Sequence, residues 1–175
     1  MNETELIEIS EFIYLLADSA KKITMTGFNS SHQVIGKEDG SPVTQYDINA
    51  EKIIIDLIKK NFPNHNIIAE ENESQNNASD YTWIIDPIDG TNNFLHGIPH
   101  FAISIGLEKN NEVIAGMIFD PIKNEMFFAE KGRGAYLNNS RIRVSSRNIV
   151  ADSIALTGGP AYAEPNKKIF YEEYI

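Results

Sequence analysis

Two aspartates three residues apart, Asp86 and Asp89, follow directly on a short apolar run over residues 83–85. Such a run is typical of a strand that is buried on both faces. Pro87 lies between the aspartates, and because proline has no N–H and a fixed φ, we expect the hydrogen-bonded ladder to stop there and the chain to turn. The turn brings two carboxylates close together, and carboxylates are ligands for hard cations such as Mg²⁺.

The residues behind the two aspartates favour the binding of an anion. Gly90 allows a backbone conformation that other residues resist, and Thr91 or Asn92 is expected to cap a short helix that begins there. The free N–H groups at the start of a helix bind phosphate. Carboxylates for a cation and N–H groups for an anion in one small volume together predict a phosphate–metal site.

Two other interpretations of this stretch need no phosphate. A calcium-binding EF-hand loop requires ligands at positions where this sequence has Ile85 and Pro87, and a glutamate where it has His96, so that interpretation is excluded. An ordinary Asp-Pro and Asp-Gly turn after a strand needs no ligand at all. From the motif alone, this second interpretation stays open.

The elements that must position this stretch begin with two helices. Apolar residues from Leu6 to Ile23 recur at helical spacing and predict an amphipathic helix over residues 4–26, which Gly27 is expected to end. A polar loop over residues 28–42 follows.

A second helix is expected to open at Thr44 or Asp47 and to end near residues 61–63, where a proline stands. The apolar residues expected on its inward face are Ile53, Ile54, Leu57 and Ile58.

The remaining pattern is that of strands. Residues 65–69 predict a short strand that delivers Glu70 and Glu71 at its end, and residues 72–80 predict a surface loop. Further strands are expected over residues 101–107, 113–119, 125–129, 135–137, 142–144 and 153–157. Helices first and antiparallel strands afterwards indicate an α+β fold.

The composition narrows the class of protein. The 175 residues suffice for one domain with a real core, and a mean hydropathy of −0.29 is typical of soluble globular proteins. No apolar run could cross a bilayer, residues 1–10 carry no basic secretory signal, and zero cysteines exclude a disulfide framework, so we expect a cytoplasmic protein with no membrane partner. The net charge of −10 argues against nucleic acid as a partner.

Several stretches together resemble the inositol monophosphatase family, whose members are Mg²⁺-dependent, lithium-sensitive phosphatases. Residues 84–94 match the family's signature, and residues 96–105 continue the match. Residues 69–71 stand where the family has Gly-Glu-Glu, with alanine replacing the glycine, and residues 43–47 match its Val-Thr-x-x-Asp. Residues 132–138 resemble the stretch before the family's domain junction, so the motifs occur in family order along nearly the whole chain.

The resemblance implies an α+β domain in which two N-terminal helices pack on an antiparallel sheet, as in the N-terminal domain of sugar phosphatases. Family members continue into a second, α/β domain with a Trp-Asp-x-Ala-Ala-Gly motif, whose Asp completes one metal site. Trp83 is the only tryptophan here, and that motif does not occur. We therefore expect residues 1–150 to form the metal- and phosphate-binding domain and residues 151–175 to be the start of a truncated second domain.

The resemblance also implies the metal ligands. The first Mg²⁺ is expected on Glu70, Asp86 and the carbonyl oxygen of Ile88. Asp86 is expected to bridge to a second ion, which Asp89 also binds. Glu70 is further expected to help a third, more hydrated ion.

The resemblance implies a catalytic role for three residues and substrate binding by three, and Thr91 belongs to both sets. Thr91 and Asp47 resemble the pair that orients and deprotonates the attacking water, and Glu70 joins them through the third ion. The substrate is expected to contact Asp89, Gly90 and Thr91, with the N–H groups of the last two around the phosphate.

For five residues near the motif a plainer role stays open. Asp47 is also a plausible helix N-cap. Glu71 is either a support for the metal ligands or a solvated neighbour, and Lys37 either closes over the site from its loop or is simply solvated. His96 and His100 are expected to be packing or turn residues rather than ligands.

The expected function is Mg²⁺-dependent hydrolysis of inositol monophosphate or a similar polyol phosphate by a metal-activated water. Residues 92–94 favour inositol over the bisphosphorylated substrates of related families, and the spacing of Asp86 and Asp89 differs from the Asp-x-Asp of phosphatases with a nucleophilic aspartate. The alternative is a truncated chain that no longer catalyses and at most binds metal or associates with a full-length relative through a bared apolar face. A homodimer, common in the family, is an open expectation.

Overall fold

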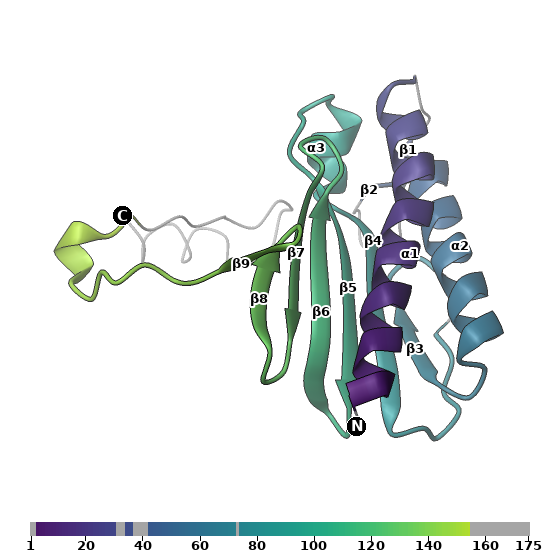
Figure 1. Cartoon of the computed structure of the whole chain (residues 1–175). Helices are drawn as coiled ribbons and strands as arrows, with labels where there is room; N and C mark the ends of the chain where they lie inside the picture. Colours follow the sequence, from purple (N-terminus) through teal and green to yellow (C-terminus); the bar gives the residue numbers. More distant parts are fainter. Residues whose placement is uncertain (1–2, 31–33, 37–41, 73, 155–175) are drawn as a thin grey trace, which may run out of the picture.

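The computed structural model describes residues 3–30, 34–36, 42–72 and 74–154, and it places two long helices along one face of a large sheet (Figure 1). The helical elements are α1 (Glu3–Phe28), α2 (Gln45–Asn61), α3 (Thr91–Leu95) and the 3₁₀ turn η1 (Val150–Asp152). The strands are β1 (Val34–Gly36), β2 (Pro42–Thr44), β3 (Asn66–Ala69), β4 (Tyr81–Asp89), β5 (Ala102–Lys109), β6 (Glu112–Asp120), β7 (Glu125–Glu130), β8 (Gly134–Leu137) and β9 (Ser140–Ile142).

The large sheet has seven strands in the order β3-β4-β5-β6-β7-β8-β9. Every neighbouring pair is antiparallel except β3 and β4, which run parallel. The expected α+β class, with two N-terminal helices packed on an antiparallel sheet, is therefore confirmed, and the pair of β3 and β4 is its one parallel exception. The parallel pair matters for the site, because parallel strands end at the same edge of a sheet.

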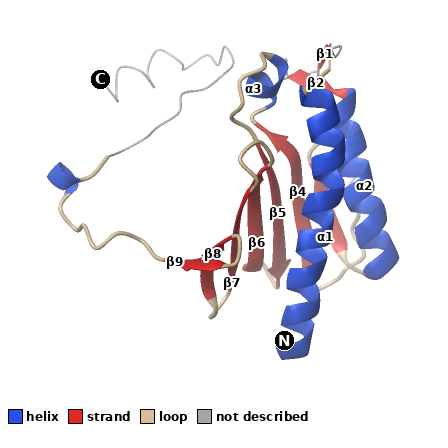
Figure 2. Cartoon of the chain, turned by 45° about the horizontal axis from the view of Figure 1, so that its top comes forward, coloured by secondary structure: helices blue, strands red, loops and turns tan. Residues whose placement is uncertain are grey.

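The core lies between the sheet and the two helices, which run side by side (Figures 1 and 2). Among its most buried side chains are Ile13, Leu16, Ile54, Ile58, Trp83, Ile103, Ile105 and Leu107. Burial of one such aliphatic side chain contributes about 1.5–3 kcal/mol. The inward face of α2 needs a small correction, since Ile53 and Leu57 are only half-buried and Ile55 is buried instead. No helix among the described residues is long and apolar enough to cross a membrane.

Strand β4 differs from its expected form in two ways. Its two faces are unlike, because Trp83 and Ile85 are buried whereas Ile84 between them is 36% exposed. In addition, the ladder does not stop at Pro87: pairing with β5 is interrupted after Asp86 and resumes where Asp89 lies opposite Ala102. The irregularity gives the proline a position at which no ladder N–H is needed.

Two local expectations upstream and downstream of β4 were also wrong. The polar loop expected over residues 28–42 contains strand β1, which pairs antiparallel with β2. The N-cap of α3 is Gly90 at a φ of 96°, and neither Thr91 nor Asn92 caps the helix. Glycine adopts this left-handed conformation without strain, which is why it can stand where a capping side chain was expected.

The end of the chain agrees only in part with the expected strands. Strand β9 stops at Ile142, so the strand expected over residues 142–144 is shifted toward the N-terminus. Residues 153 and 154 follow η1 without joining a strand. The rest of the strand expected over residues 153–157 lies outside the described residues, as does Lys37.

Gly27 does not end α1 but lies in its last turn, one residue before the end at Phe28. A Cβ atom at this position would lie 2.5 Å from Cγ of Tyr46 and 2.9 Å from Cζ of Phe94. Real Cβ atoms do not approach other heavy atoms so closely, so the missing side chain is what lets α1 pack against the start of α2 and against α3. The glycine is required by packing between helices rather than by a turn.

Replacement of Gly27 by alanine is therefore expected to destabilise the fold by about 1–3 kcal/mol, because the Tyr46 and Phe94 rings must move. Alanine's better helix propensity acts in the opposite direction by about 1 kcal/mol. Urea unfolding would measure the difference, with the exposed neighbour Thr26→Ala as the control, for which a change within about 0.5 kcal/mol is expected. A Gly27→Ala variant as stable as the wild type would contradict this account of the packing.

The sheet face opposite the helices carries a broad apolar groove. Its volume is about 1060 Å³, and it extends over β4 to β9. Side chains that line it and are 36–53% exposed are Ile84, Ile118, Phe127 and Ile142. Gly106 of β5 and Gly116 of β6 lie opposite one another in the ladder and keep the middle of the groove open. Exposed apolar surface of this extent marks a site where another surface binds.

Candidate active site

The parallel strands bring Glu70 and Asp86 to one edge of the sheet. Ala69, the last residue of β3, lies opposite Ile85 of β4, so Glu70 and Asp86 are the next residues of two adjacent parallel strands. The carboxyl groups of Glu70 and Asp86 are hydrogen bonded, and Asp89 is close enough for its charge to act on Asp86. Three of the side chains expected to bind metal are thus neighbours.

The turn after β4 is held by its own side chains. The Ile88 N–H donates to Oδ1 of Asp86 at 3.1 Å, which closes the turn around Pro87. Gly90 follows with its positive φ, and a Cβ there would lie 3.3 Å from the carbonyl oxygen of His100. Both the backbone conformation and the space therefore favour glycine at the point where α3 begins.

Asp47 and Thr91 form a second contact across the site. Asp47 lies in the first turn of α2 and is only 1% exposed, and its Oδ2 accepts a hydrogen bond from the Thr44 N–H at 2.9 Å. The Thr91 hydroxyl lies 3.4 Å from Oδ1 of Asp47 and 3.1 Å from the carbonyl oxygen of Ile88. Thr44 is the N-cap and Asp47 the third residue of a capping box, so the interpretation of Asp47 as the N-cap itself was wrong.

Burial raises the pKa of the Asp47 carboxyl, and hydrogen bonds from Thr44 and Thr91 partly offset this effect. A carboxylate with a raised pKa is a stronger base than an exposed one. The hydroxyl of Thr91 lies between this carboxylate and the Ile88 carbonyl. The pair is therefore arranged to accept a proton from a group bound at the end of β4.

The acidic edge of the sheet is electrostatically strained. Burial, followed by repulsion from Glu70 and Asp89, raises the pKa of Asp86 to about 8. A divalent cation among these carboxylates would relieve the repulsion, and carboxylate and carbonyl oxygens are the donors that Mg²⁺ prefers. Within the described part of the chain, no three Asp, Glu or His side chains form a ready-made metal cage. The residues fit Mg²⁺ by donor type and charge.

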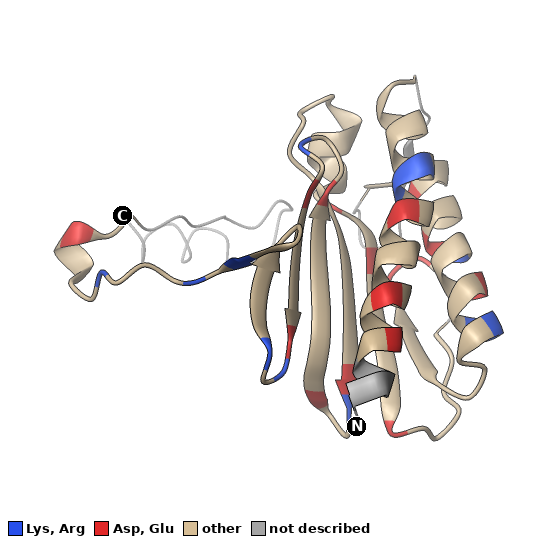
Figure 3. Ribbon diagram, viewed as in Figure 1, with Lys and Arg blue, Asp and Glu red and all other residues tan. Residues whose placement is uncertain are grey.

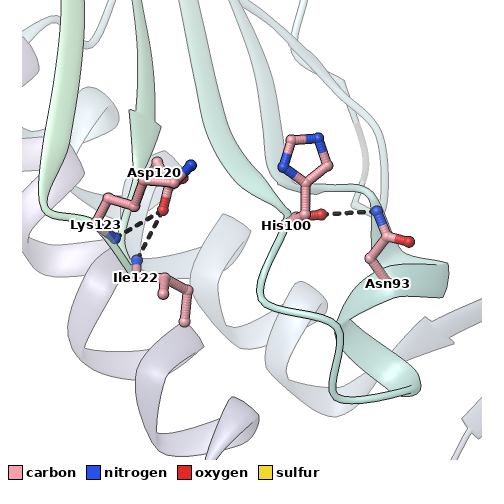
Figure 4. A network of polar contacts seen from close by, with 5 residues as sticks. All are labelled: Asn93, His100, Asp120, Ile122 and Lys123. Carbon is pink, nitrogen blue, oxygen red and sulfur yellow. Dashed lines mark hydrogen bonds and ion pairs between the residues drawn. The ribbon is translucent and has the colours of Figure 1, made fainter.

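A cavity of about 400 Å³ opens beside Asp89. At its rim the side-chain amide of Asn93 donates to the carbonyl oxygen of His100 at 2.7 Å (Figure 4). On another part of the rim, Asp120 accepts a hydrogen bond from the Lys123 N–H at 2.9 Å. The cavity has the size of a small-molecule site and a polar rim whose backbone is held by these contacts.

The other candidates contribute differently. Glu71 is half-buried, and its N–H donates to Oε2 of Glu51 in α2 at 2.8 Å. His96 and His100 are exposed, and the ring of His96 lies 2.7 Å from the Asn92 carbonyl oxygen, as expected of a turn residue.

One buried acid near the site was not singled out by the sequence pattern. Glu51 lies one helical turn after Asp47 in α2 and is 0% exposed. Its carboxylate accepts hydrogen bonds from the backbone of the turn that contains Glu70. The available signal was its position: a charged residue on the face of α2 that otherwise carries apolar residues.

Residues 5–174 match the family model described as "Inositol monophosphatase family", and the chain belongs to that family. It is 42% identical over 135 residues to an inositol-1-monophosphatase of Rhizobium meliloti and 46% identical over 119 residues to the Nus factor SuhB of Haemophilus influenzae.

Solved structures agree with this assignment. The extragenic suppressor protein SuhB of Bartonella henselae matches 95% of this chain with a TM-score of 0.88 at 36% identity. The inositol monophosphatase of Thermotoga maritima matches 79% of the chain with a TM-score of 0.74 at 40% identity.

The chain spans about half the length of the curated relatives it matches. The aligned regions are 77% of this chain but 51% of the Rhizobium protein, and 67% of this chain but 45% of the Haemophilus protein. Among the structures, the match covers 65% of the Bartonella chain and 54% of the Thermotoga chain.

Proposed function

We propose that this chain provides the metal and phosphate site for Mg²⁺-dependent hydrolysis of inositol monophosphate or a similar polyol phosphate to the free alcohol and phosphate. The observation that supports this function best is the meeting of Glu70, Asp86 and Asp89 at one sheet edge, next to the Asp47–Thr91 contact. A relative named inositol-1-monophosphatase is 42% identical to this chain over 135 residues, which are 77% of the chain.

In this proposal, Glu70, Asp86, Asp89 and the Ile88 carbonyl are the residues that would hold Mg²⁺. Magnesium supplies charge neutralisation for the phosphate and a lowered pKa for the attacking water. Asp89 also contacts the substrate, whose alcohol portion occupies the adjoining cavity.

The attacking water gives its proton to the Thr91 hydroxyl, which passes its own proton on to the Asp47 carboxylate. The Thr91 hydroxyl already donates a hydrogen bond to this carboxylate. Burial of Asp47 raises its pKa and strengthens it as a base. The N–H groups of Gly90 and Thr91 bind the phosphate oxygens as the phosphate charge develops.

The first test is phosphate release from inositol 1-phosphate by the purified 175-residue chain with Mg²⁺, with Mg²⁺ and lithium, and with the variant Asp89→Asn. Lithium-sensitive release that the substitution abolishes is the expected result. If the chain is soluble and folded but releases no phosphate, this chain does not catalyse the reaction by itself, and the proposal is contradicted.

The open sheet face favours a second candidate function, association with another polypeptide. The relatives carry about half of their length outside the matched region, and the apolar groove over β4 to β9 is a surface on which further structure can pack. In this view residues 1–150 are the site-bearing domain and residues 151–175 the beginning of another. The chain then either binds metal without turnover or becomes active when a relative, or a second copy, covers the groove.

Phe127→Glu is expected to weaken association through this face, because it places a charge on an apolar side chain that is 41% exposed in the groove. Sedimentation velocity of the wild type at increasing concentration should show self-association, and the variant should shift toward monomer. Leu15→Glu is the matched control, since Leu15 is 48% exposed on α1. Equal weakening by both substitutions, or none by Phe127→Glu, would contradict a role of the groove.

We do not assign a nucleic acid as a direct partner. The chain carries 25 acidic and 15 basic residues, and Figure 3 shows acidic positions along the two long helices and the sheet of the described part. Residues 131–147 hold five basic residues and no acidic one, but the net charge of −10 repels a phosphate backbone. Some relatives are named Nus factor SuhB, so an electrophoretic shift assay with RNA is a direct check, and no shift by the isolated chain is expected.

We propose a cytoplasmic location for the chain.

A further inference from the structure

Glu51 is a buried carboxylate to which the proposed chemistry gives no role. It lies on α2 with 0% exposure, and its partners are N–H groups of the turn after β3. Its Oε2 accepts from the backbone N–H of Glu70 at 3.1 Å and of Glu71 at 2.8 Å. Its Oε1 accepts from the backbone N–H of Asn72 at 2.9 Å and from the Asn72 side-chain amide at 3.3 Å.

These contacts fix the backbone from which Glu70 projects. The turn follows β3, a four-residue strand that pairs with β4 on one side and is bridged to Gln75 through Ile67. Three consecutive N–H groups directed at one carboxylate leave the turn a single orientation relative to α2. Charge-assisted hydrogen bonds of this kind are about twice as strong as neutral ones, so the constraint is substantial.

The same helix face also holds the other half of the site. Asp47 and Glu51 are four residues apart in α2 and therefore lie on one face, one turn above the other. Asp47 contacts Thr91 at the end of β4, and Glu51 holds the turn with Glu70 at the end of β3. One rigid element thus sets the positions of the metal-ligand turn and of the Thr91 hydroxyl relative to each other.

We propose that Glu51 is a positioning residue for Mg²⁺ binding, acting through the backbone of Glu70 without touching metal or substrate. The inference rests on the proposed function, because it presumes that Glu70 is a ligand. Groups that orient a metal ligand in this way change metal affinity by 10- to 100-fold when they are removed. We expect this effect to require the carboxylate at its present position, within hydrogen-bonding distance of the turn. A negative charge elsewhere on the side chain does not suffice.

Two variants separate position from charge. Glu51→Gln keeps the size of the side chain but turns an amide NH₂ toward an N–H donor of the turn. Glu51→Asp keeps the charge and withdraws the carboxylate by one methylene group. Asp56→Asn, an exposed carboxylate on the same helix, is the matched control for loss of one negative charge.

Calorimetric titration of the full 175-residue chain with Mg²⁺ gives the affinities, and amide NMR spectra of the metal-free proteins report the turn directly. Both Glu51 variants are expected to bind Mg²⁺ about tenfold or more weakly, with shifted amide resonances for Glu70, Glu71 and Asn72. Asp56→Asn should stay within about twofold of the wild type.

Three results would overturn the inference. Wild-type affinity in a folded Glu51→Gln variant would show that the turn does not depend on this carboxylate. Weakening by Glu51→Gln with wild-type affinity in Glu51→Asp would show that the charge, and not its place, is responsible. A wild-type chain that binds no Mg²⁺ would overturn the proposed function first, and this inference with it.

Discussion

Asp86→Asn is expected to make the metal-free protein more stable at alkaline pH by several kcal/mol, on the order of 4–5. In the folded chain, burial and then the charges of Glu70 and Asp89 raise the pKa of Asp86 to about 8, from an ordinary value of 3.8. The folded state therefore binds one more proton than the unfolded state between these two values. The contribution of Asp86 to stability is complete below about pH 4, and it is lost as the pH rises to about 8. Asparagine removes this loss.

Urea unfolding in EDTA at pH values from 5 to 9 would measure the effect. The wild type should lose stability across this range, whereas Asp86→Asn should lose much less. Asp56→Asn, which removes an exposed carboxylate from α2, should follow the wild type. Parallel curves for the wild type and Asp86→Asn would contradict the electrostatic account of the site.

Asp86→Asn also separates the effect of carboxylate repulsion on stability from the effect of Mg²⁺ binding. A ligand that binds only the folded state raises stability by mass action, so Mg²⁺ at 100 times its dissociation constant should add about 2.7 kcal/mol to the wild type. The gain should be largest above pH 8, where the carboxylates are ionised. Asp86→Asn should lose nearly all of it, because the residue is proposed to hold Mg²⁺. A full Mg²⁺ response in the variant would exclude Asp86 as a ligand.

Thr91→Ala is expected to lower phosphate release about a hundredfold or more while leaving Mg²⁺ affinity within a few-fold of the wild type. The Thr91 hydroxyl lies 3.4 Å from Oδ1 of Asp47 and is the link that we propose between that carboxylate and the attacking water. Its loss removes proton transfer and the contact to the Ile88 carbonyl, whereas the carboxylates of the metal edge remain.

Thr91→Ser is the matched control, because it keeps the hydroxyl and removes only a methyl group. It should retain most of the rate, and Asp47→Asn should resemble Thr91→Ala. Phosphate release at saturating Mg²⁺, with calorimetry for the metal, would separate loss of rate from loss of metal. Equal rates for Thr91→Ala and Thr91→Ser would remove Thr91 from the proton path.

Where side-chain pattern is local, the sequence predicted the fold well. The spacing of apolar residues in α1 and α2, and the turn residues between β5, β6 and β7, indicated those elements within a few residues of their bounds. Each depends on neighbours a few residues away along the chain, such as a helical stripe or an Asn-Asn turn. The Asp-Pro-x-Asp-Gly-Thr motif was readable for the same reason, since its turn closes on itself through Asp86 and Ile88.

The tertiary structure decided features that join segments far apart in the chain. Gly27 was expected to end a helix, and only its distance from Tyr46 and Phe94 shows that it serves packing. Strand β4 was expected to be buried on both faces, but the helices cover only one face, and Ile84 on the other face lies in the open groove. Exposure depends on which layer lies above a residue, and a strand's own sequence does not contain that information.

The sequence alone therefore determined the chemical groups of the site and the order in which they occur. It could not determine that the parallel pairing of β3 and β4 places Glu70 beside Asp86, or that Glu51 holds the turn between them. The hydrogen bonds that Glu51 accepts span about twenty residues of the chain, and the one that Thr91 donates to Asp47 spans 44. Such contacts form only when the sheet and α2 have packed, because burial fixes their register and excludes the water that would otherwise bind these groups.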